Sequence, residues 1–227
     1  FDEGVNRVAN LLLGQGMQKG DRIAILSPNS VDYALLFMGI LRAGGCVTPL
    51  STMASGEALE KMLVDCSAST IFVARQYLDL VEGFLGGMDI TRYAMDFEAP
   101  GYHAMPAALG SADTTDPMVE IDLKDAFNLI YSSGTTGTPK GILHDHWMRA
   151  AQMDRVTPNG YDDNARTLIS TPLYSNTTIV AFVPTLFGGS TVHLMPKFDA
   201  REYLQIVQAE KITHTMLVPV QYKRIMD

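Results

Sequence analysis

One short segment of the chain combines glycines, hydroxyl side chains and a lysine at the end of a predicted apolar strand. It runs from Tyr131 to Gly141 and reads YSSGTTGTPKG. Glycine lacks a Cβ atom, so backbone N–H groups can converge on an anion there. Serine and threonine hydroxyls add donors, and lysine adds a compact positive charge. This combination suits a polyphosphate, although a polar hairpin turn between two strands would have a similar composition.

Two common phosphate-binding motifs do not fit this segment. The Walker A pattern requires a second glycine five residues after the first, followed by lysine and then serine or threonine. Counting from Gly134, Pro139 stands where that glycine belongs, and Lys140 is followed by Gly141. The dinucleotide-binding fingerprint does not fit either. The pair Gly14 and Gly16 has Lys19 where the third glycine should be, and it precedes a predicted strand, whereas the fingerprint follows one.

The segment resembles the phosphate-binding loop of the adenylate-forming superfamily, which includes acyl-CoA synthetases, aryl-CoA ligases, luciferases and peptide-synthetase adenylation domains. That loop has the form Tyr/Phe-Thr/Ser-Ser-Gly-Ser/Thr-Thr-Gly-x-Pro-Lys-Gly, and residues 131–141 match nearly every position. Further similar segments are LRAGGCVTPL at 41–50, HDH at 144–146, FGG at 187–189, FD at 198–199, TH at 213–214 and VP at 218–219. The resemblance therefore covers essentially the whole chain.

The resemblance implies roles for two groups of residues. The residues expected to bind the phosphates of ATP are Ser132, Ser133, Gly134, Thr135, Thr136, Gly137, Thr138 and Lys140. The residues expected to line an acyl pocket, where the family has Pro-Leu-Phe-His, are Tyr174, Ser175, Asn176 and Thr177. Ser175 replaces the usual histidine, so the gating role of that histidine does not carry over. The alternative for Tyr174 is a helix-entry residue packed on the sheet.

The implied activity is that of an ATP-dependent carboxylate–CoA ligase. A carboxylate attacks the α-phosphate of ATP, pyrophosphate leaves, and the thiol of coenzyme A then displaces AMP. ATP, Mg²⁺ and coenzyme A would be the cosubstrates, and a small carboxylic acid the substrate; the sequence leaves the acid open. The alternatives are a peptide-synthetase adenylation domain, a luciferase-like enzyme, or a non-catalytic fragment that only binds nucleotide. The His-x-His at 144–146 favours a CoA ligase.

Several motifs of that family are not in this sequence. They are the Tyr-Gly-x-Thr-Glu for adenine and magnesium, the ribose-binding Asp, and the catalytic Lys of a small C-terminal domain. We therefore expect no catalytic residue here, no activity from this chain alone, and only part of a large N-terminal AMP-binding domain, with the C-terminal domain absent. We expect residues 1–95 to form a first βα half, 96–125 an irregular connection, and 126–227 the half with the phosphate loop and acyl pocket.

The elements that must position these residues alternate between strands and helices. The predicted strands cover residues 22–26, 46–48, 70–74, 91–95, 126–132, 141–144, 166–171, 191–195 and 214–218. The predicted helices cover residues 4–13, 31–42, 56–64, 76–84, 147–155, 178–187 and 200–209, with Ser55 and Asp199 as caps of two of them. Such βα units at short intervals are typical of an α/β fold with a mostly parallel sheet and helices on both faces.

Composition narrows the choice of partners and location. The 227 residues are 47% hydrophobic and 19% charged, as in ordinary globular proteins. A formal charge of −8 without a basic run argues against a nucleic-acid partner, and the longest apolar run, Tyr33–Leu41, is about half a membrane span. Cys46 and Cys66 are expected to be buried thiols in a reducing compartment, so we predict a cytoplasmic protein. No metal site is predicted, and the sequence leaves the oligomeric state open.

Overall fold

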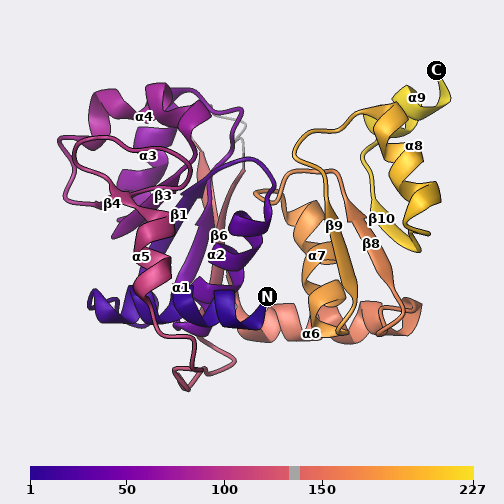
Figure 1. Ribbon diagram of the computed structural model, residues 1–227, viewed down its shortest axis with the longest axis horizontal. Helices are drawn as coiled ribbons and strands as arrows, with labels where there is room; N and C mark the ends of the chain where they lie inside the picture. Colours follow the sequence, from indigo (N-terminus) through magenta and orange to yellow (C-terminus); the bar gives the residue numbers. More distant parts are fainter. Residues whose placement is uncertain (133–138) are drawn as a thin grey trace. The chain divides into compact units, whose positions relative to one another are not determined.

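The computed structural model describes residues 1–132 and 139–227 (Figure 1). The chain divides into two units, each with its own sheet. Unit 1 consists of Phe1–Ser27 and Val31–Trp147, and unit 2 of Pro28–Ser30 and Met148–Asp227.

Unit 1 is built on a seven-stranded sheet. Its strands are β1 (Arg22–Leu26), β2 (Cys46–Pro49), β3 (Thr70–Val73), β4 (Thr91–Ala94), β5 (His103–Ala104), β6 (Ala126–Ser132) and β7 (Lys140–Asp145). The strand order is β5-β4-β3-β1-β2-β6-β7, and the neighbours are parallel except for the antiparallel pair of β6 and β7. The helices of this part of the chain are α1 (Asp2–Gly14), α2 (Val31–Arg42), α3 (Gly56–Cys66), the 3-10 helix η1 (Arg75–Tyr77), α4 (Leu78–Leu85) and α5 (Met105–Ser111).

Helices cover both faces of this sheet, which explains why strands β1, β2 and β3 are buried at nearly every position. Successive side chains of a strand point to opposite faces. Ala24 and Leu26 of β1 pack with residues of α3 and α4 in one buried cluster. Ile23 and Ile25 face the other way and are also fully buried. Burial on both faces is usual for parallel sheets, because the helices that connect their strands pack on the faces of the sheet.

Helices α1 and α2 of unit 1 approach each other closely at Gly39. A Cβ atom at residue 39 would overlap the Cβ atom of Val8 and would lie 2.9 Å from the carbonyl oxygen of Val5. Val8 is fully buried. Gly39 is therefore required for the distance between the two helices, although glycine is a poor helix former.

We predict opposite effects of Gly→Ala substitution at two helical glycines of unit 1. Gly39→Ala should destabilise the intact protein by about 1–3 kcal/mol, because a methyl group has no space there. Gly83→Ala, the control in α4, should stabilise it by roughly 0.5–1 kcal/mol, since nothing lies within 4 Å of a Cβ atom at residue 83. Urea denaturation measures both, and equal effects of the same sign would contradict the prediction.

Unit 2 is a smaller three-layer arrangement. Its strands are β8 (Arg166–Ile169), β9 (Thr191–Leu194) and β10 (His214–Met216), all parallel in the order β10-β8-β9. Its helices are α6 (His146–Val156, whose first two residues belong to unit 1), the 3-10 helix η2 (Thr157–Asn159), α7 (Asn176–Phe187), α8 (Ala200–Ala209) and α9 (Pro219–Met226). Thr167 of β8 hydrogen-bonds Thr185 of α7, while the next residue, Leu168, packs with Tyr203 of α8. The two faces of the sheet are thus covered by different helices.

The predicted α/β fold with a mostly parallel sheet is confirmed, with two differences in detail. The strands form two sheets, because β8 pairs with β9 and β10 and not with any strand of unit 1. The region 96–125, predicted to be irregular, contains the short strand β5 and helix α5. Pro106 lies in the first turn of α5, where a missing backbone N–H costs nothing. Cys46 and Cys66 are free, buried thiols, as predicted.

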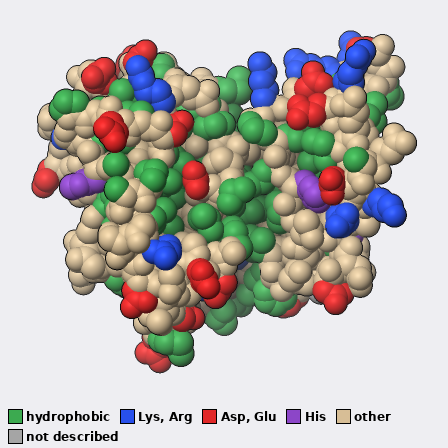
Figure 2. Space-filling view, viewed as in Figure 1, with side chains coloured by type: hydrophobic (Ala, Val, Ile, Leu, Met, Phe, Trp, Pro, Cys, Tyr) green, Lys and Arg blue, Asp and Glu red, His purple; other side chains and the backbone are tan. Residues whose placement is uncertain are grey.

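The surface carries charges of both signs. On the face shown in Figure 2, lysine and arginine side chains lie among acidic ones and do not form a single basic area. Across the residues that the structure describes, no helix combines the length and the apolar character needed to cross a membrane.

Candidate functional site

The predicted phosphate loop connects the two antiparallel strands of unit 1. Ser132 ends β6 and Lys140 begins β7, and the two residues are paired across the ladder. Both are exposed. The other predicted loop residues, from Ser133 to Thr138, lie outside the described residues. Because β6 is parallel to β2, the loop leaves the sheet at its carboxyl edge, which is where open α/β sheets bind ligands.

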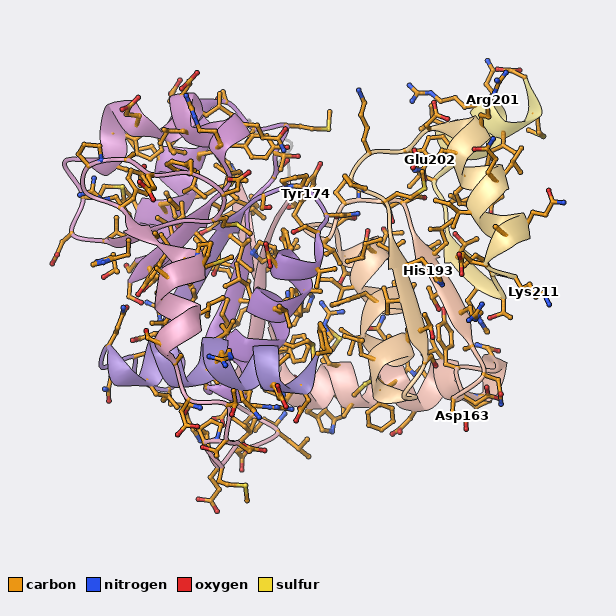
Figure 3. The ribbon with its side chains drawn as sticks, viewed as in Figure 1. Asp163, Tyr174, His193, Arg201, Glu202 and Lys211 are labelled. Carbon is orange, nitrogen blue, oxygen red and sulfur yellow. The ribbon has the colours of Figure 1, made fainter. Side chains whose placement is uncertain are left out.

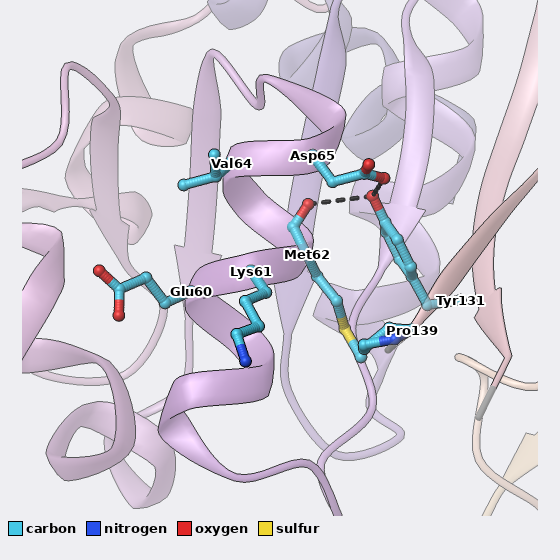
Figure 4. Close-up of a pocket in the computed structure, with 7 residues that line it drawn as sticks. All are labelled: Glu60, Lys61, Met62, Val64, Asp65, Tyr131 and Pro139. Atoms are coloured by element: carbon cyan, nitrogen blue, oxygen red, sulfur yellow. Dashed lines mark hydrogen bonds between the residues drawn. The ribbon is translucent and has the colours of Figure 1, made fainter. Parts of the chain in front are cut away.

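The end of β6 is attached to helix α3 through the Tyr131 hydroxyl. This hydroxyl donates to Asp65 Oδ2 at 2.6 Å, and the carbonyl oxygen of Met62 lies 3.0 Å away (Figure 4). Burial, and then the hydrogen bond to Asp65, raises the pKa of Tyr131 above its ordinary value. The phenol therefore keeps its proton at physiological pH and acts as a donor. The residue next to the predicted loop is thus fixed to a helix.

A pocket of about 490 Å³ opens beside this contact. It lies between α3 and the ends of β6 and β7 that flank the predicted loop, and Figure 4 shows its lining residues. The residues that line it are Glu60, Lys61, Met62, Val64, Asp65, Tyr131 and Pro139. Pro139 is the last residue before β7. Helix α3 and both strand ends that flank the predicted loop therefore line the same pocket.

We predict that the Tyr131–Asp65 contact contributes measurably to stability. Tyr131→Phe and Asp65→Ala should each lower the free energy of unfolding of the intact protein, and a hydrogen bond to a charged group is worth about 1.5–3 kcal/mol before solvent exposure weakens it. Asp65 is exposed, so we expect a coupling energy near 1 kcal/mol from the double-mutant cycle. Strictly additive single effects would show that the contact contributes nothing.

The four residues predicted to line an acyl pocket lie in unit 2, between β8 and the first turn of α7. Ser175 occupies the N-cap position of α7 without a capping hydrogen bond from its side chain. Tyr174 and Ser175 are half-buried, and Asn176 and Thr177 are exposed. Figure 3 shows Tyr174 and Asp163 at opposite ends of the unit, since Tyr174 follows the carboxyl end of β8 and Asp163 precedes its amino end.

Sequence reasoning missed a buried cation next to this group. Arg149 of α6 is only 1% exposed, and burial lowers the pKa of its guanidinium to about 10, so it remains charged at neutral pH. It donates to Asn176 Oδ1 at 2.8 Å and to Gln152 Oε1 at 2.9 Å. The amide oxygen of Asn176 is therefore held by Arg149. Nothing in the local sequence pattern of α6 distinguishes this arginine from an exposed one.

The two histidines of the His-x-His segment pack at the end of the β6–β7 pair. Nδ1 of His144 lies 3.1 Å from Nδ2 of Asn128, which is fully buried. The ring of His146 meets the ring of Phe127 edge-on, with centroids 5.0 Å apart. Among residues 1–132 and 139–227, no three His, Cys, Asp or Glu side chains form a group that could hold a metal ion.

We predict that His146 makes the protein less stable in mild acid. Burial lowers the pKa of its imidazole below the ordinary 6.5, against the opposing effect of Asp125 and Asp145. As the pH falls from 7 to 5, the unfolded chain binds a proton at this histidine before the folded chain does, so the free energy of unfolding decreases. His146→Gln should make that decrease smaller in urea denaturation at the two pH values. An unchanged decrease would rule out His146 as its source.

The chain belongs to the AMP-binding enzyme family, whose model matches residues 1–227. It is 28% identical over 217 residues to the long-chain-fatty-acid–CoA ligase FadD13 of Mycobacterium tuberculosis, covering 94% of this chain and 42% of that protein. It is 34% identical over 224 residues to 4-coumarate–CoA ligase 3 of Arabidopsis thaliana, covering 94% and 39%. The chain thus spans about two fifths of the length of these relatives.

The fold also matches a solved structure. The inhibitor-bound N-terminal domain of FACL13 from Mycobacterium tuberculosis superposes with a TM-score of 0.88 at 25% sequence identity. The match covers 99% of this chain and 56% of that one. The family and the fold are therefore established together, while the roles of the individual loop and pocket residues stay predictions.

Proposed function

We propose that this chain is part of the N-terminal domain of an AMP-forming carboxylate–CoA ligase, with residues 1–95, 96–125 and 126–227 as its three successive parts. The observation that carries the proposal is the segment YSSGTTGTPKG, which connects β6 and β7 at the carboxyl edge of the parallel sheet. The names of the relatives support it, since both are CoA ligases for carboxylic acids.

The proposed reaction has two steps. A carboxylate oxygen attacks the α-phosphorus of ATP, and the bond from that phosphorus to the oxygen of the β-phosphate breaks, so pyrophosphate leaves with its negative charge. The thiol of coenzyme A then loses its proton, its sulfur attacks the acyl carbon, and AMP leaves with the electrons of the broken C–O bond. In the first step, preorganised donors that face the departing phosphates stabilise the growing charge.

The loop supplies those donors in this proposal. Ser132 and Lys140 stand on paired positions of β6 and β7, so the hydroxyl and the ammonium group flank the residues between them. The Tyr131–Asp65 contact holds the first of these strands against α3. Mg²⁺ would add positive charge near the phosphates. Among the described residues, no three His, Cys, Asp or Glu side chains form a group that could hold it.

The acid would bind at Tyr174, Ser175, Asn176 and Thr177. The half-buried Tyr174 offers an aromatic surface, and Arg149 orients Asn176 beside it. The substrate would be a small carboxylic acid, and the relatives act on acids as different as a long-chain fatty acid and 4-coumarate. We further propose a cytoplasmic location, where thiols such as Cys46 and Cys66 stay reduced.

The proposal is tested by pyrophosphate release from the intact protein over a panel of carboxylic acids, with and without coenzyme A. Release that requires both ATP and an acid, followed by formation of a CoA thioester, is the expected result. An acyl-adenylate that is passed only to a carrier protein would favour an adenylation domain. No pyrophosphate release with any acid would favour a non-catalytic nucleotide-binding protein.

We predict that Lys140→Ala and Thr136→Ala slow adenylation about 10²–10³-fold, the usual effect of removing one preorganised donor. Thioester formation from preformed acyl-AMP should change much less, because no pyrophosphate leaves in that step. The matched control is Lys124→Ala, which removes an exposed lysine just before the opposite, amino end of β6 and should leave both rates unchanged. Equal losses in both half-reactions would contradict the proposed role of the loop.

A further inference from the structure

One side chain of unit 2 satisfies three backbone groups at the carboxyl ends of two strands. Asn29 lies between β1 and α2 in the sequence, is 5% exposed, and belongs to unit 2. Its Nδ2 donates to the carbonyl oxygens of Thr171 at 2.9 Å and Met195 at 3.2 Å. Its Oδ1 accepts from the backbone N–H of Leu173 at 2.8 Å.

These partners lie just beyond the ends of the strands. Thr171 comes two residues after the end of β8, and Met195 directly after the end of β9. Strand pairing no longer satisfies all the backbone groups at these positions, and a buried polar group without a partner is costly. An asparagine amide offers two N–H donors and an acceptor oxygen on one short side chain. An aspartate at this position would keep the acceptor and lose both donors.

The segment held by Asn29 leads directly to the predicted acyl pocket. Tyr174 follows Leu173, which is fully buried. The hydroxyl of Thr178 in α7 donates to the hydroxyl of Thr171 at 2.8 Å, and the N–H of Ser175 donates to the carbonyl of Pro172 at 3.0 Å. The turn from β8 into α7 therefore has a fixed course, and Asn29 contacts it at two positions, Thr171 and Leu173.

We propose that Asn29 is a positioning residue for the carboxylic-acid site. Its amide fixes the course of the segment Thr171–Leu173 and thereby the position of Tyr174. Asn29 itself does not contact the acid. This inference rests on the proposed function, because it assigns the effect of Asn29 to the acid and not to ATP.

The first test compares steady-state kinetics of the intact protein with those of Asn29→Ala and Asn29→Asp. We expect the KM for the acid to rise about tenfold, the factor that corresponds to 1.4 kcal/mol. The KM for ATP should change less than twofold, and the order of preference among acids should change. A purely structural role would instead lower the active fraction, and with it kcat for every acid, without moving either KM.

The matched control is Asn10→Ala. Asn10 also donates to two backbone carbonyls, those of Asp113 at 3.0 Å and Thr115 at 2.8 Å, but it lies in unit 1. Its loss should leave both KM values unchanged. If the Asn29 variants do not fold, Thr178→Val removes the hydroxyl contact to Thr171 with little change in volume, and it should raise the KM for the acid in the same direction.

Amide hydrogen exchange gives a second readout that does not depend on activity. In Asn29→Ala, or in Thr178→Val, a peptide that covers residues 171–179 should exchange faster, while peptides from α8 keep their protection. Unchanged exchange in that peptide, or a KM for the acid that does not rise in an active variant, overturns the inference alone. A wild-type protein that releases no pyrophosphate with any acid overturns the proposed function, and the inference with it.

Discussion

Parallel pairing is the constraint from which the rest of this structure follows. Two parallel strands cannot be joined by a tight turn, so a crossover must return the chain across a face of the sheet before the next strand begins. The parallel strands of a sheet therefore all end at the same edge. Strand pairing restricts neither the length nor the sequence of the segments that follow the strands at that edge. In unit 2 these are residues 170–175 and 195–199.

The pair β6–β7 is the exception in unit 1, and it is informative. Because these strands run antiparallel, a short connection suffices, and its two ends are held opposite each other by the ladder. The paired position of Ser132 and Lys140 follows from backbone hydrogen bonding alone. Tyr131 adds a side-chain attachment to α3 directly beside it. The segment proposed to bind phosphates is thus flanked by two regular strands, β6 and β7.

Local signals predicted the elements well because local chemistry determines them. Ser55 accepts a hydrogen bond from the N–H of Ala58, and Asp199 from that of Glu202, as capping residues do, and these two helices begin where the sequence indicates. The division of the strands into two sheets could not be foreseen, because strand order depends on contacts between distant segments. Helix α5 was missed since prolines and glycines surround it.

The candidate site likewise contains features that the sequence predicted and features that it did not. The loop was recognisable because its glycines, hydroxyls and lysine are contiguous in the sequence. Arg149 and Asn29 were not, because the site partner of Arg149, Asn176, is 27 residues away and the partners of Asn29 are up to 166 residues away, and burial of a polar side chain has no sequence signature. What these two residues do became visible only when the chain was folded, since each is defined by the groups it satisfies.

The assignment of Pro28–Ser30 to unit 2 has a consequence for the chain as a whole. The backbone passes from unit 1 to unit 2 after Ser27, returns after Ser30, and passes again after Trp147. A fragment that begins at Met148 contains most of unit 2 but lacks Asn29. The backbone groups of Thr171, Leu173 and Met195 that Asn29 contacts would lose this partner in such a fragment. Recombination between related genes would meet the same restriction. A crossover at residue 147 takes Asn29 from one parent and the segments that carry its carbonyl partners, Thr171 and Met195, from the other.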